Sequence, residues 1–315
     1  MNDKIKTIWI TGGRGFIGRC LAMRASQAAV KVYGIGHGFW TAEEAGQCGF
    51  SSWVNGEIES TNLKQLAQLS GLPDVVFHLA GGSSVGLSML NPSEYFRRTV
   101  ETTSRLVEWL RTESVLSRLV CVSSAAVYGS GHLGTIPENA RVSPYSPYGY
   151  HKLMMENICS SYSQNFGIQS CIVRLFSVYG VALKKQLIWD IFGKLDANSS
   201  GPLTLGGTGR EIRDWLYISD AVKLLWTAAT SSSPNCSVIN GGSGVGVSVS
   251  AIARLVCNAW GTDVDIAFSG VSRKGDPDSL VANISRARHL GFECEVTLKD
   301  GILNTLKWYR GEECF

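Results

Sequence analysis

The sequence predicts an α/β fold, a doubly wound parallel sheet flanked by helices and followed by a smaller C-terminal α/β lobe. Three observations support this prediction. A glycine-rich turn joins the first apolar strand to the first helix, short β-branched strands then alternate with helices, and this alternation breaks down in the last third of the chain. Parallel strands that are joined by helices are buried on both faces and therefore appear as short apolar runs.

The composition is that of an ordinary globular chain. With 315 residues, 44% hydrophobic and 17% charged, it can bury a sizeable core, and a net charge of +3 is too small to indicate nucleic acid or a membrane as partner. The nine cysteines form no C-x-x-C pair and no histidines cluster, so we expect reduced thiols and no metal site. Because no apolar run approaches ~18 residues and the chain starts with a strand, we expect no membrane span, no signal peptide and a cytoplasmic location.

The first predicted strand, residues 4–10, runs directly into a glycine-rich loop. Residues 11–18 read Thr-Gly-Gly-Arg-Gly-Phe-Ile-Gly, and residues 20–29 predict a helix. Glycines at this spacing permit a tight turn, a close approach of backbone to a pyrophosphate, and close packing of helix on strand. The helix N-terminus offers its free N–H groups to the phosphates. The loop therefore predicts a Rossmann-type dinucleotide-binding domain.

The second predicted strand, residues 31–35, ends where such folds place an acid that binds the adenosine ribose of NAD. Gly36 and His37 stand there instead. A carboxylate at this place would repel a 2′-phosphate, and Arg14 of the glycine loop supplies a cation that attracts one. The sequence therefore favours NADP(H) as the cofactor, with NAD(H) as the alternative.

Further elements follow in order along the chain. We predict a short helix at 62–69, strands at 75–79, 119–122 and 170–175, a long helix that opens at Asn91-Pro92, and a helix between Ser146 and Gly167. The apolar side of that last helix is predicted to be Met154, Ile158, Tyr162 and Phe166. Glycine-rich stretches at 201–210 and 238–250 interrupt the pattern. We assign residues 1–176 to the dinucleotide-binding domain and 177–315 mainly to the smaller lobe, with an approximate boundary that the chain can cross.

The chemistry is predicted at Tyr148 and Lys152, which lie one turn apart on a helix and face the same way. A free phenol titrates near ~10, and a neighbouring ammonium lowers its pKa by favouring the phenolate. Lys152 is therefore expected to lower the pKa of Tyr148, which then acts as general acid or base toward an alcohol or ketone. Ser123 and Ser124 end a predicted strand at the edge where open parallel sheets bind ligands.

These residues, in this order, resemble the extended short-chain dehydrogenase/reductase family, and within it the branch of nucleotide-sugar epimerases, dehydratases and ketoreductases. The resemblance covers nearly the whole chain. It rests on residues 11–18, His78-Leu79-Ala80-Gly81, residues 123–129, the Tyr148 and Lys152 pair, residues 209–215 with their Arg-Asp pair, and residues 273–277.

The resemblance implies a role for each of these segments. Ser124 would orient the substrate oxygen, Tyr148 would transfer the proton, and Lys152 would also hold the nicotinamide ribose. The predicted cofactor contacts are Gly12, Arg14, Gly15, Phe16, Ile17, Gly18, His37, Glu57, Ile58, Leu79, Ala80, Gly81, Thr99, Tyr148 and Lys152. The predicted substrate contacts are Ser83, Ser124, Ser177, Arg213 and Arg273, with the two guanidinium groups on the diphosphate. We expect a nucleotide sugar as ligand and a homodimer.

Departures from the family pattern narrow the reaction. Ala125 and Ala126 stand where the 4,6-dehydratases carry an Asp-Glu pair, and alanine also replaces the cysteine of the branch that epimerises at carbons 3 and 5. The reaction that remains is the transfer of one hydride and one proton at a single sugar carbon, C4. Thr99 and Ser177 replace asparagines of many epimerases. The sequence thus favours an NADPH-dependent NDP-4-keto-6-deoxyhexose reductase over an NAD-dependent 4-epimerase of the UDP-glucose/UDP-galactose type. A non-catalytic dinucleotide sensor, the third hypothesis, would not need the catalytic trio.

Overall fold

The computed structural model describes residues 5–197, 201–231, 235–271 and 277–312. The chain divides into two compact units and passes between them more than once. Unit 1 comprises residues 1–128, 142–174 and 222–239, and unit 2 comprises residues 129–141, 175–221 and 240–315.

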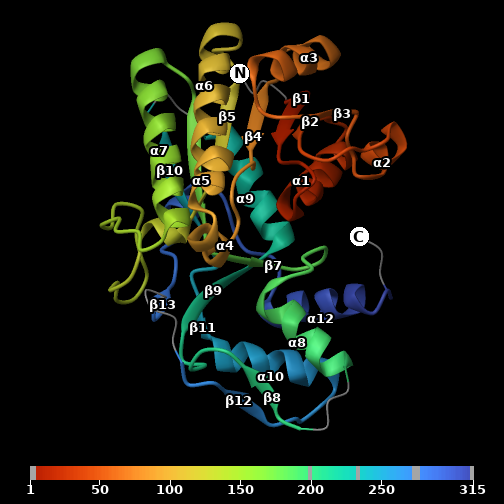
Figure 1. Ribbon diagram of the computed structural model, residues 1–315, viewed down its shortest axis with the longest axis vertical. Coiled ribbons are helices and arrows are strands. Elements are labelled where there is room, and N and C mark those ends of the chain that lie inside the picture. The colour runs from red at the N-terminus through yellow and green to blue at the C-terminus, as the bar shows by residue number, and fades with distance from the viewer. Residues whose placement is uncertain (1–4, 198–200, 232–234, 272–276, 313–315) are drawn as a thin grey trace. The chain divides into compact units, whose positions relative to one another are not determined.

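Unit 1 is built on a seven-stranded sheet with the order β10-β6-β5-β4-β1-β2-β3 (Figure 1). The strands are β1 (Thr7–Thr11), β2 (Lys31–Gly36), β3 (Ser52–Asn55), β4 (Val75–His78), β5 (Arg118–Ser124), β6 (Ser170–Leu175) and β10 (Ser237–Gly241). β1 pairs in parallel with β2 on one side and with β4 on the other, so the strand order reverses at β1. This reversal is typical of doubly wound sheets and confirms the predicted fold class.

Helices connect these strands. They are α1 (Phe16–Gln27), α2 (Ala42–Gln47), α3 (Ser60–Ser70), α4 (Val85–Leu90), α5 (Pro92–Phe96), α6 (Thr102–Glu113), α7 (Pro147–Phe166) and α9 (Ile218–Thr230). A π-helical turn, η1 (Arg97–Glu101), joins α5 to α6, so these elements together form the predicted long helix. A 3-10 turn, η2 (Ala125–Val127), follows β5 directly.

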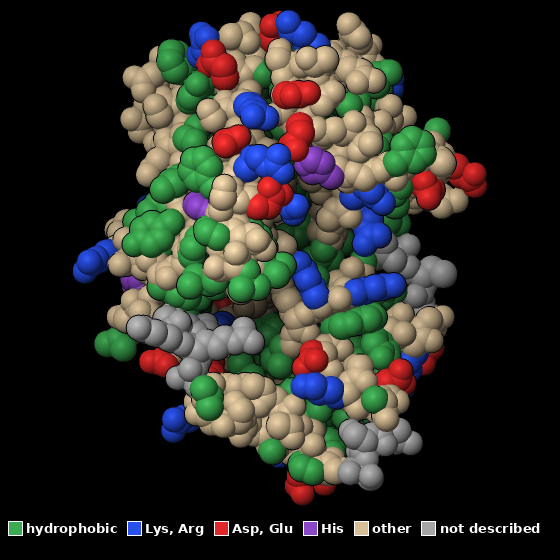
Figure 2. Space-filling view, in the orientation of Figure 1, with side chains coloured by type: hydrophobic (Ala, Val, Ile, Leu, Met, Phe, Trp, Pro, Cys, Tyr) green, Lys and Arg blue, Asp and Glu red, His purple; other side chains and the backbone are tan. Residues whose placement is uncertain are grey.

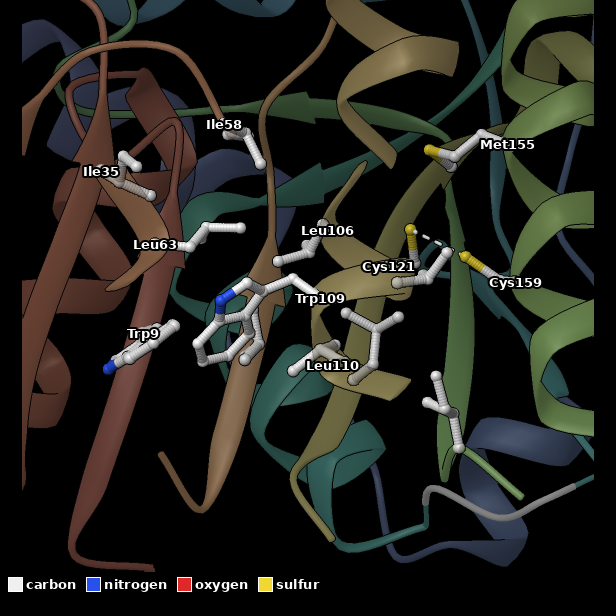
Figure 3. Packing of buried hydrophobic residues seen from close by; sticks show 14 of the residues in the cluster. Trp9, Ile35, Ile58, Leu63, Leu106, Trp109, Leu110, Cys121, Met155 and Cys159 are labelled. Atoms are coloured by element: carbon white, nitrogen blue, oxygen red, sulfur yellow. Dashed lines mark hydrogen bonds between the residues drawn. The ribbon is translucent and has the colours of Figure 1, made fainter. Parts of the chain in front are cut away.

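The core of unit 1 lies between the sheet and helices α3, α6 and α7, as the side chains in Figure 3 illustrate. The Trp9 ring of β1 packs 5.1 Å from the Trp109 ring of α6. Phe77 of β4 instead stacks on Trp226 of α9, at 6.0 Å. Val76 packs in the same cluster as Trp9 and Trp109. Because successive residues of a strand point to opposite faces, Phe77 lies on the other face of the sheet. The sheet is therefore covered on both faces, as its apolar strands predict.

Helix α7 begins and ends at the predicted residues. The Ser146 hydroxyl accepts a hydrogen bond from the Gly149 N–H at 3.2 Å, and Gly167 ends the helix in the left-handed conformation with φ of 75°. The predicted buried stripe is wrong at its two ends, because Met154 and Phe166 are 42% and 47% exposed. A neighbouring face is buried instead, which consists of Lys152, Met155, Glu156, Cys159 and Ser163. Its polar side chains can be buried because they bond to strands β5 and β6.

The sequence patterns missed five helices and strands among these elements. Helices α2, α4 and α9 and strand β3 lie in stretches for which no element was predicted, and β10 lies mostly in the glycine-serine stretch that was read as irregular. Helix α1 also begins four residues earlier than predicted, at Phe16, because the glycine loop turns directly into the helix. The thiols of Cys121 and Cys159 lie in the core, 3.6 Å apart (dashed line in Figure 3). All eight cysteines in the described part of the chain are free.

Unit 2 contains a four-stranded sheet, a two-stranded sheet and helices. Its strands are β7 (Ser177–Tyr179), β8 (Leu203–Leu205), β9 (Ile212–Tyr217), β11 (Gly246–Ser248), β12 (Ile266–Phe268) and β13 (Ser279–Leu280). Its helices are α8 (Gln186–Asp196), α10 (Val249–Trp260), α11 (Ser285–His289) and α12 (Leu298–Tyr309). β9 is central, because it pairs with β7, β11 and β13. Helices α8, α10 and α12 pack through aromatic rings, with Trp189, Phe192 and Trp260 all within 6.0 Å of Tyr309.

Candidate active site

The glycine loop after β1 leaves backbone open where a phosphate would bind. Gly12 has φ of +68°, and a Cβ atom there would lie 2.8 Å from the Ala80 nitrogen. A Cβ atom on Gly18 would lie 2.7 Å from the Gly13 Cα. Gly15 is the N-cap of α1 and has no side chain to bond to the first N–H groups of the helix. This geometry fits a pyrophosphate at the helix N-terminus, and Phe16 and Ile17 begin the helix there.

His78 ties the glycine loop to the long helix. Its Nδ1 lies 2.8 Å from the Thr11 hydroxyl and its Nε2 lies 2.9 Å from the Thr103 hydroxyl. The Thr103 hydroxyl donates to the Thr99 carbonyl at 2.6 Å, so it accepts from Nε2–H, and Nδ1 accepts from Thr11. Burial lowers the pKa of His78 to about 3. The imidazole is therefore neutral, and it holds both segments that the sequence predicts for the cofactor.

Residues of both charges meet at the end of β2. The His37 Nε2 lies 3.4 Å from a Glu57 carboxylate oxygen. The exposed Arg14 guanidinium lies over the Trp40 ring at 5.0 Å and against Gly38, whose Cβ would clash with it. The Arg97 Nη1 also lies 3.9 Å from the Glu57 carboxylate. The end of β2 therefore lies near one carboxylate and two guanidinium groups, although the strand itself carries no acid.

Figure 2 shows that acidic and basic side chains are interspersed on one face of the protein. Along the long helix, Glu94 pairs with Arg97 and Arg98 at 2.8 and 2.5 Å. Such exposed pairs contribute little to stability. Among the helices that the structure describes, none combines the length and apolarity needed to cross a membrane. No group of three or more potential metal ligands occurs within the described ranges.

Ser124, Tyr148 and Lys152 lie together in unit 1. Ser124 is the last residue of β5, and its hydroxyl accepts a hydrogen bond from the Ala126 N–H at 3.2 Å. Burial raises the pKa of Tyr148, and a hydrogen bond with the Ser124 side chain partly offsets this. The buried Lys152 ammonium donates to the Val122 carbonyl at 2.8 Å, and burial lowers its pKa. Two hydroxyls and one amine thus meet at the carboxyl end of β5.

The expected lowering of the Tyr148 pKa by Lys152 is not found, because Lys152 is not among the groups that shift this pKa. The sequence predicts a lowered phenol pKa, whereas the pKa of Tyr148 is raised. Two facts explain the difference. The phenol is removed from water, which penalises its charged form, and the ammonium is directed to the Val122 carbonyl. Of Ser124 and Lys152, only Ser124 lowers the pKa of Tyr148, through its hydrogen bond.

The segment after β4 runs along this amine. A Cβ atom on Gly81 would lie 3.4 Å from the Lys152 Nζ and 3.3 Å from the Thr99 hydroxyl oxygen, and the Gly82 N–H donates to that hydroxyl at 3.0 Å. Leu79 and Ala80 are half-buried, Ser83 is exposed, and Ile58 is 3% exposed within the core cluster. Most residues predicted for the cofactor therefore border the same strand ends of unit 1.

Arg213, predicted for the diphosphate, and Ser177, predicted for the substrate, lie in unit 2. Arg213 is on β9, between Val247 of β11 and Leu280 of β13, and its Nη1 donates to the Ile212 carbonyl at 2.9 Å. Ser177 begins β7 and pairs with β9 at Trp215. Arg273 and its neighbours lie outside the described residues.

Asp214, which follows the predicted arginine, has a structural role that was not predicted. Its fully buried carboxylate accepts bonds from the Ser243 N–H and hydroxyl at 2.6 and 2.7 Å, from the Gly244 N–H at 2.9 Å and from the Ala282 N–H at 3.1 Å. These partners precede β11 and follow β13 in the chain. Asp214 therefore holds the strands on both sides of Arg213. The adjacent Arg-Asp pair was the available signal.

Comparison with known proteins adds to this geometry. A family model described as "NAD dependent epimerase/dehydratase family" matches residues 8–241. The chain is 33% identical to the "Uncharacterized UDP-glucose epimerase YtcB" of Bacillus subtilis, over 78% of this chain and 79% of that protein. It is 29% identical to a UDP-glucose 4-epimerase of Azospirillum brasilense, over 97% and 92% of the two chains. The crystal structure of UDP-glucuronic acid 4-epimerase from Bacillus cereus, in complex with UDP-glucuronic acid and NAD, is 27% identical. It has a TM-score of 0.86 and covers 98% of this chain and 100% of its own.

Proposed function

Because the chain belongs to the NAD-dependent epimerase/dehydratase family, within the extended short-chain dehydrogenases/reductases, we propose that it is an NAD-dependent 4-epimerase of nucleotide sugars. One observation carries this proposal. Ser124 and Tyr148 meet beside the Lys152 amine, and the next residues are the buried Ala125 and Ala126. This set of groups supports the removal and the return of one hydride and one proton at a single carbon, and no further group for elimination or for epimerisation at another carbon follows Ser124.

Each residue of the trio has a distinct task in this proposal. A bound NAD would supply hydride transfer at C4 of the sugar, from one face and back to the other face after the keto sugar has rotated. Tyr148 removes the proton of the C4 hydroxyl and later returns it to the ketone oxygen. The raised pKa of Tyr148 favours the second task, because the phenol keeps its proton at neutral pH. The Ser124 hydroxyl assists the first task, since its hydrogen bond stabilises the phenolate, and it also orients the C4 oxygen.

The names of the relatives support the epimerase ahead of the reductase that the sequence favoured. Two of the relatives above are named as 4-epimerases, and one of them was solved with NAD. The structure adds an argument about the cofactor. The Glu57 carboxylate lies 3.4 Å from His37 at the end of β2, where a negative charge repels a 2′-phosphate. NAD therefore takes precedence over NADP(H) in this proposal.

The NADPH-dependent 4-ketoreductase is the second candidate, and one observation favours it. The exposed Arg14 guanidinium lies at the same strand end, against Gly38 and over Trp40, and a guanidinium attracts a 2′-phosphate. Both candidates share the nucleotide-sugar substrate. We propose that Arg213 of unit 2 binds its diphosphate, because a guanidinium matches phosphate oxygens in pairs, and that the residues after 176 mainly bind this substrate.

Identification of the resident cofactor tests this proposal. We expect purified protein to release NAD on denaturation and, with no cofactor added, to convert UDP-glucose into a mixture with UDP-galactose. Release of NADP, or conversion of a 4-keto sugar nucleotide that stops when NADPH is left out, would favour the reductase instead.

A further inference from the structure

Unit 1 buries an ion pair that the trio does not include. Arg174 of β6 binds both carboxylate oxygens of Glu156 on α7, with Nε at 3.0 and 3.2 Å and Nη2 at 2.7 Å. The Ser123 hydroxyl donates to the same carboxylate at 2.5 Å, and Arg174 Nη1 donates to the Tyr128 hydroxyl at 3.1 Å. All four side chains are buried, with at most 6% exposed.

A buried ion pair is poorly explained as a device for stability. The cost of removing two charges from water offsets most of their attraction, and apolar replacements of similar volume are often as stable. We therefore ask which neighbouring residues the ion pair holds in place. Ser123 precedes Ser124 in the chain and Tyr128 follows the 3-10 turn after it, so the pair holds both flanks of the catalytic hydroxyl.

Three contacts join the last residues of β5 to one face of α7. Tyr148, Lys152 and Glu156 are spaced by four residues and share one face of the helix, and each contacts one of the last three residues of the strand. The contacts pair Val122 with Lys152, Ser123 with Glu156, and Ser124 with Tyr148. Two of these contacts fix the register, and the third is the contact between the reacting hydroxyls.

We propose that Glu156 and Arg174 are positioning residues for the reaction, which hold β5 and α7 in the register that brings the Ser124 and Tyr148 hydroxyls together. The pair acts through Ser123, Tyr128 and the helix, and neither side chain contacts the reacting carbon. The proposal rests on the function proposed above for its kinetic consequence, but the contact between the two hydroxyls can be measured without substrate.

A matched pair of variants tests the proposal. Ser123→Ala removes only the hydroxyl bond to Glu156. Ser163→Ala is the control. It also removes a buried hydrogen bond between α7 and a strand, from the Ser163 hydroxyl to the Ser170 hydroxyl of β6 at 2.5 Å. Ser163 lies two helical turns farther from Lys152 than Glu156 does. Both substitutions are mild enough to leave the ion pair and the fold in place, and we expect them to lower Tm by similar amounts.

The decisive readout is the ionisation of Tyr148, followed as tyrosinate absorbance in the near ultraviolet and isolated by subtracting the same titration of each protein with Tyr148→Phe. The Ser124 bond lowers the pKa of Tyr148, while burial and Tyr95 raise it. A displaced Ser124 must therefore raise that pKa further. We expect a rise of about half a unit or more in Ser123→Ala and none in Ser163→Ala. Equal titrations of Ser123→Ala and the unmodified protein would overturn the proposal.

Turnover gives the second readout. We expect kcat to fall about 5–10-fold in Ser123→Ala and more in Glu156→Gln, with cofactor affinity unchanged, and to stay within about twofold in Ser163→Ala. Equal kcat in the two serine variants, with active unmodified protein, would contradict the positioning role. If the unmodified protein converts no sugar nucleotide, the proposed function fails, and the phenol titration still decides the positioning role.

Discussion

The proposed catalytic side chains of unit 1 lie on the seven-residue strand β5 and the 20-residue helix α7, whereas the predicted diphosphate ligand of unit 2, Arg213, lies on the six-residue strand β9. In unit 1, several buried contacts along one helix face fix the hydroxyls and the amine. In unit 2, one buried carboxylate, Asp214, gathers the strands beside the arginine. A proton transfer needs hydroxyls held in register, while an arginine fork tolerates adjustment by its long side chain. The contacts in unit 1 therefore suit proton transfer, and those in unit 2 suit ligand binding.

The largest effect is expected from the reacting hydroxyl itself. Tyr148→Phe is expected to lower turnover by at least ~10²-fold, the usual contribution of an acid-base group, with cofactor affinity and Tm nearly unchanged. Steady-state kinetics with a sugar nucleotide and thermal unfolding measure both. Turnover comparable to that of the unmodified protein would remove Tyr148 from the chemistry.

The binding side of the comparison predicts a different pattern. Arg213→Ala is expected to weaken nucleotide-sugar binding by about 1.5–3 kcal/mol, the loss of a charged hydrogen bond, with cofactor affinity retained. Calorimetric titration of UDP-glucose and of the dinucleotide separates the two ligands. Arg254→Ala is the control and is expected to leave both affinities unchanged, since Arg254 is exposed and pairs with Asp263 on the surface at 3.6 Å. If binding of the dinucleotide is weakened and binding of the sugar nucleotide is unchanged, Arg213 has been assigned to the wrong ligand.

The rigid construction of unit 1 also predicts a pH dependence of stability. The pKa of buried His78 is about 3, below its usual value near ~6.5. The unfolded state therefore binds a proton first, and the free energy of unfolding falls as the pH drops below ~6.5, by about 1.4 kcal/mol per unit from this group. Between pH 6.5 and 5 the loss is about 2 kcal/mol.

A His78→Asn variant isolates this contribution. Its amide can replace the bond to Thr11 but has no ionisable group in this range. Urea unfolding of both proteins at several pH values is expected to show the steeper fall only with the histidine. Parallel pH profiles would mean that His78 keeps an ordinary pKa.

The smallest expected effect concerns the cofactor's 2′ position. Arg14→Ala is expected to cost NADPH about 1–2 kcal/mol of binding free energy and to leave NADH nearly unchanged, because only NADPH has a phosphate to lose. Fluorescence titration of both dinucleotides on both proteins measures the difference. Equal losses for the two dinucleotides would place Arg14 on the pyrophosphate instead.

Local signals in the sequence predicted much of unit 1, and tertiary contacts account for what they missed. The ends of α7 follow from Ser146, Pro147 and Gly167, which act through their own backbone. Its buried face could not be read from apolar spacing, because Glu156 is buried only through its pairing with Arg174, a residue of another strand. The sign of the Tyr148 pKa shift was missed for the same reason, since burial is a property of the fold.

The same limit applies to unit 2. The Arg-Asp pair marked Arg213, but the four donors on the Asp214 carboxylate come from residues about 30 and 70 positions away in the chain, so no local pattern reveals them. The stretch at 238–250 looked irregular because its valines are interleaved with glycine and serine. Part of it, β10, nevertheless completes the sheet of unit 1 by backbone pairing, which needs no particular side chains.

The fate of the hydride tests the central claim most directly. UDP-glucose that carries deuterium at C4 would be incubated with the protein, with no dinucleotide added, and the product examined by NMR and mass spectrometry. Return of the hydride to the same carbon predicts UDP-galactose that retains deuterium at C4. Absence of conversion, together with reduction at C4 of a 4-keto sugar nucleotide by deuterium from labelled NADPH, would contradict the epimerase and establish the reductase.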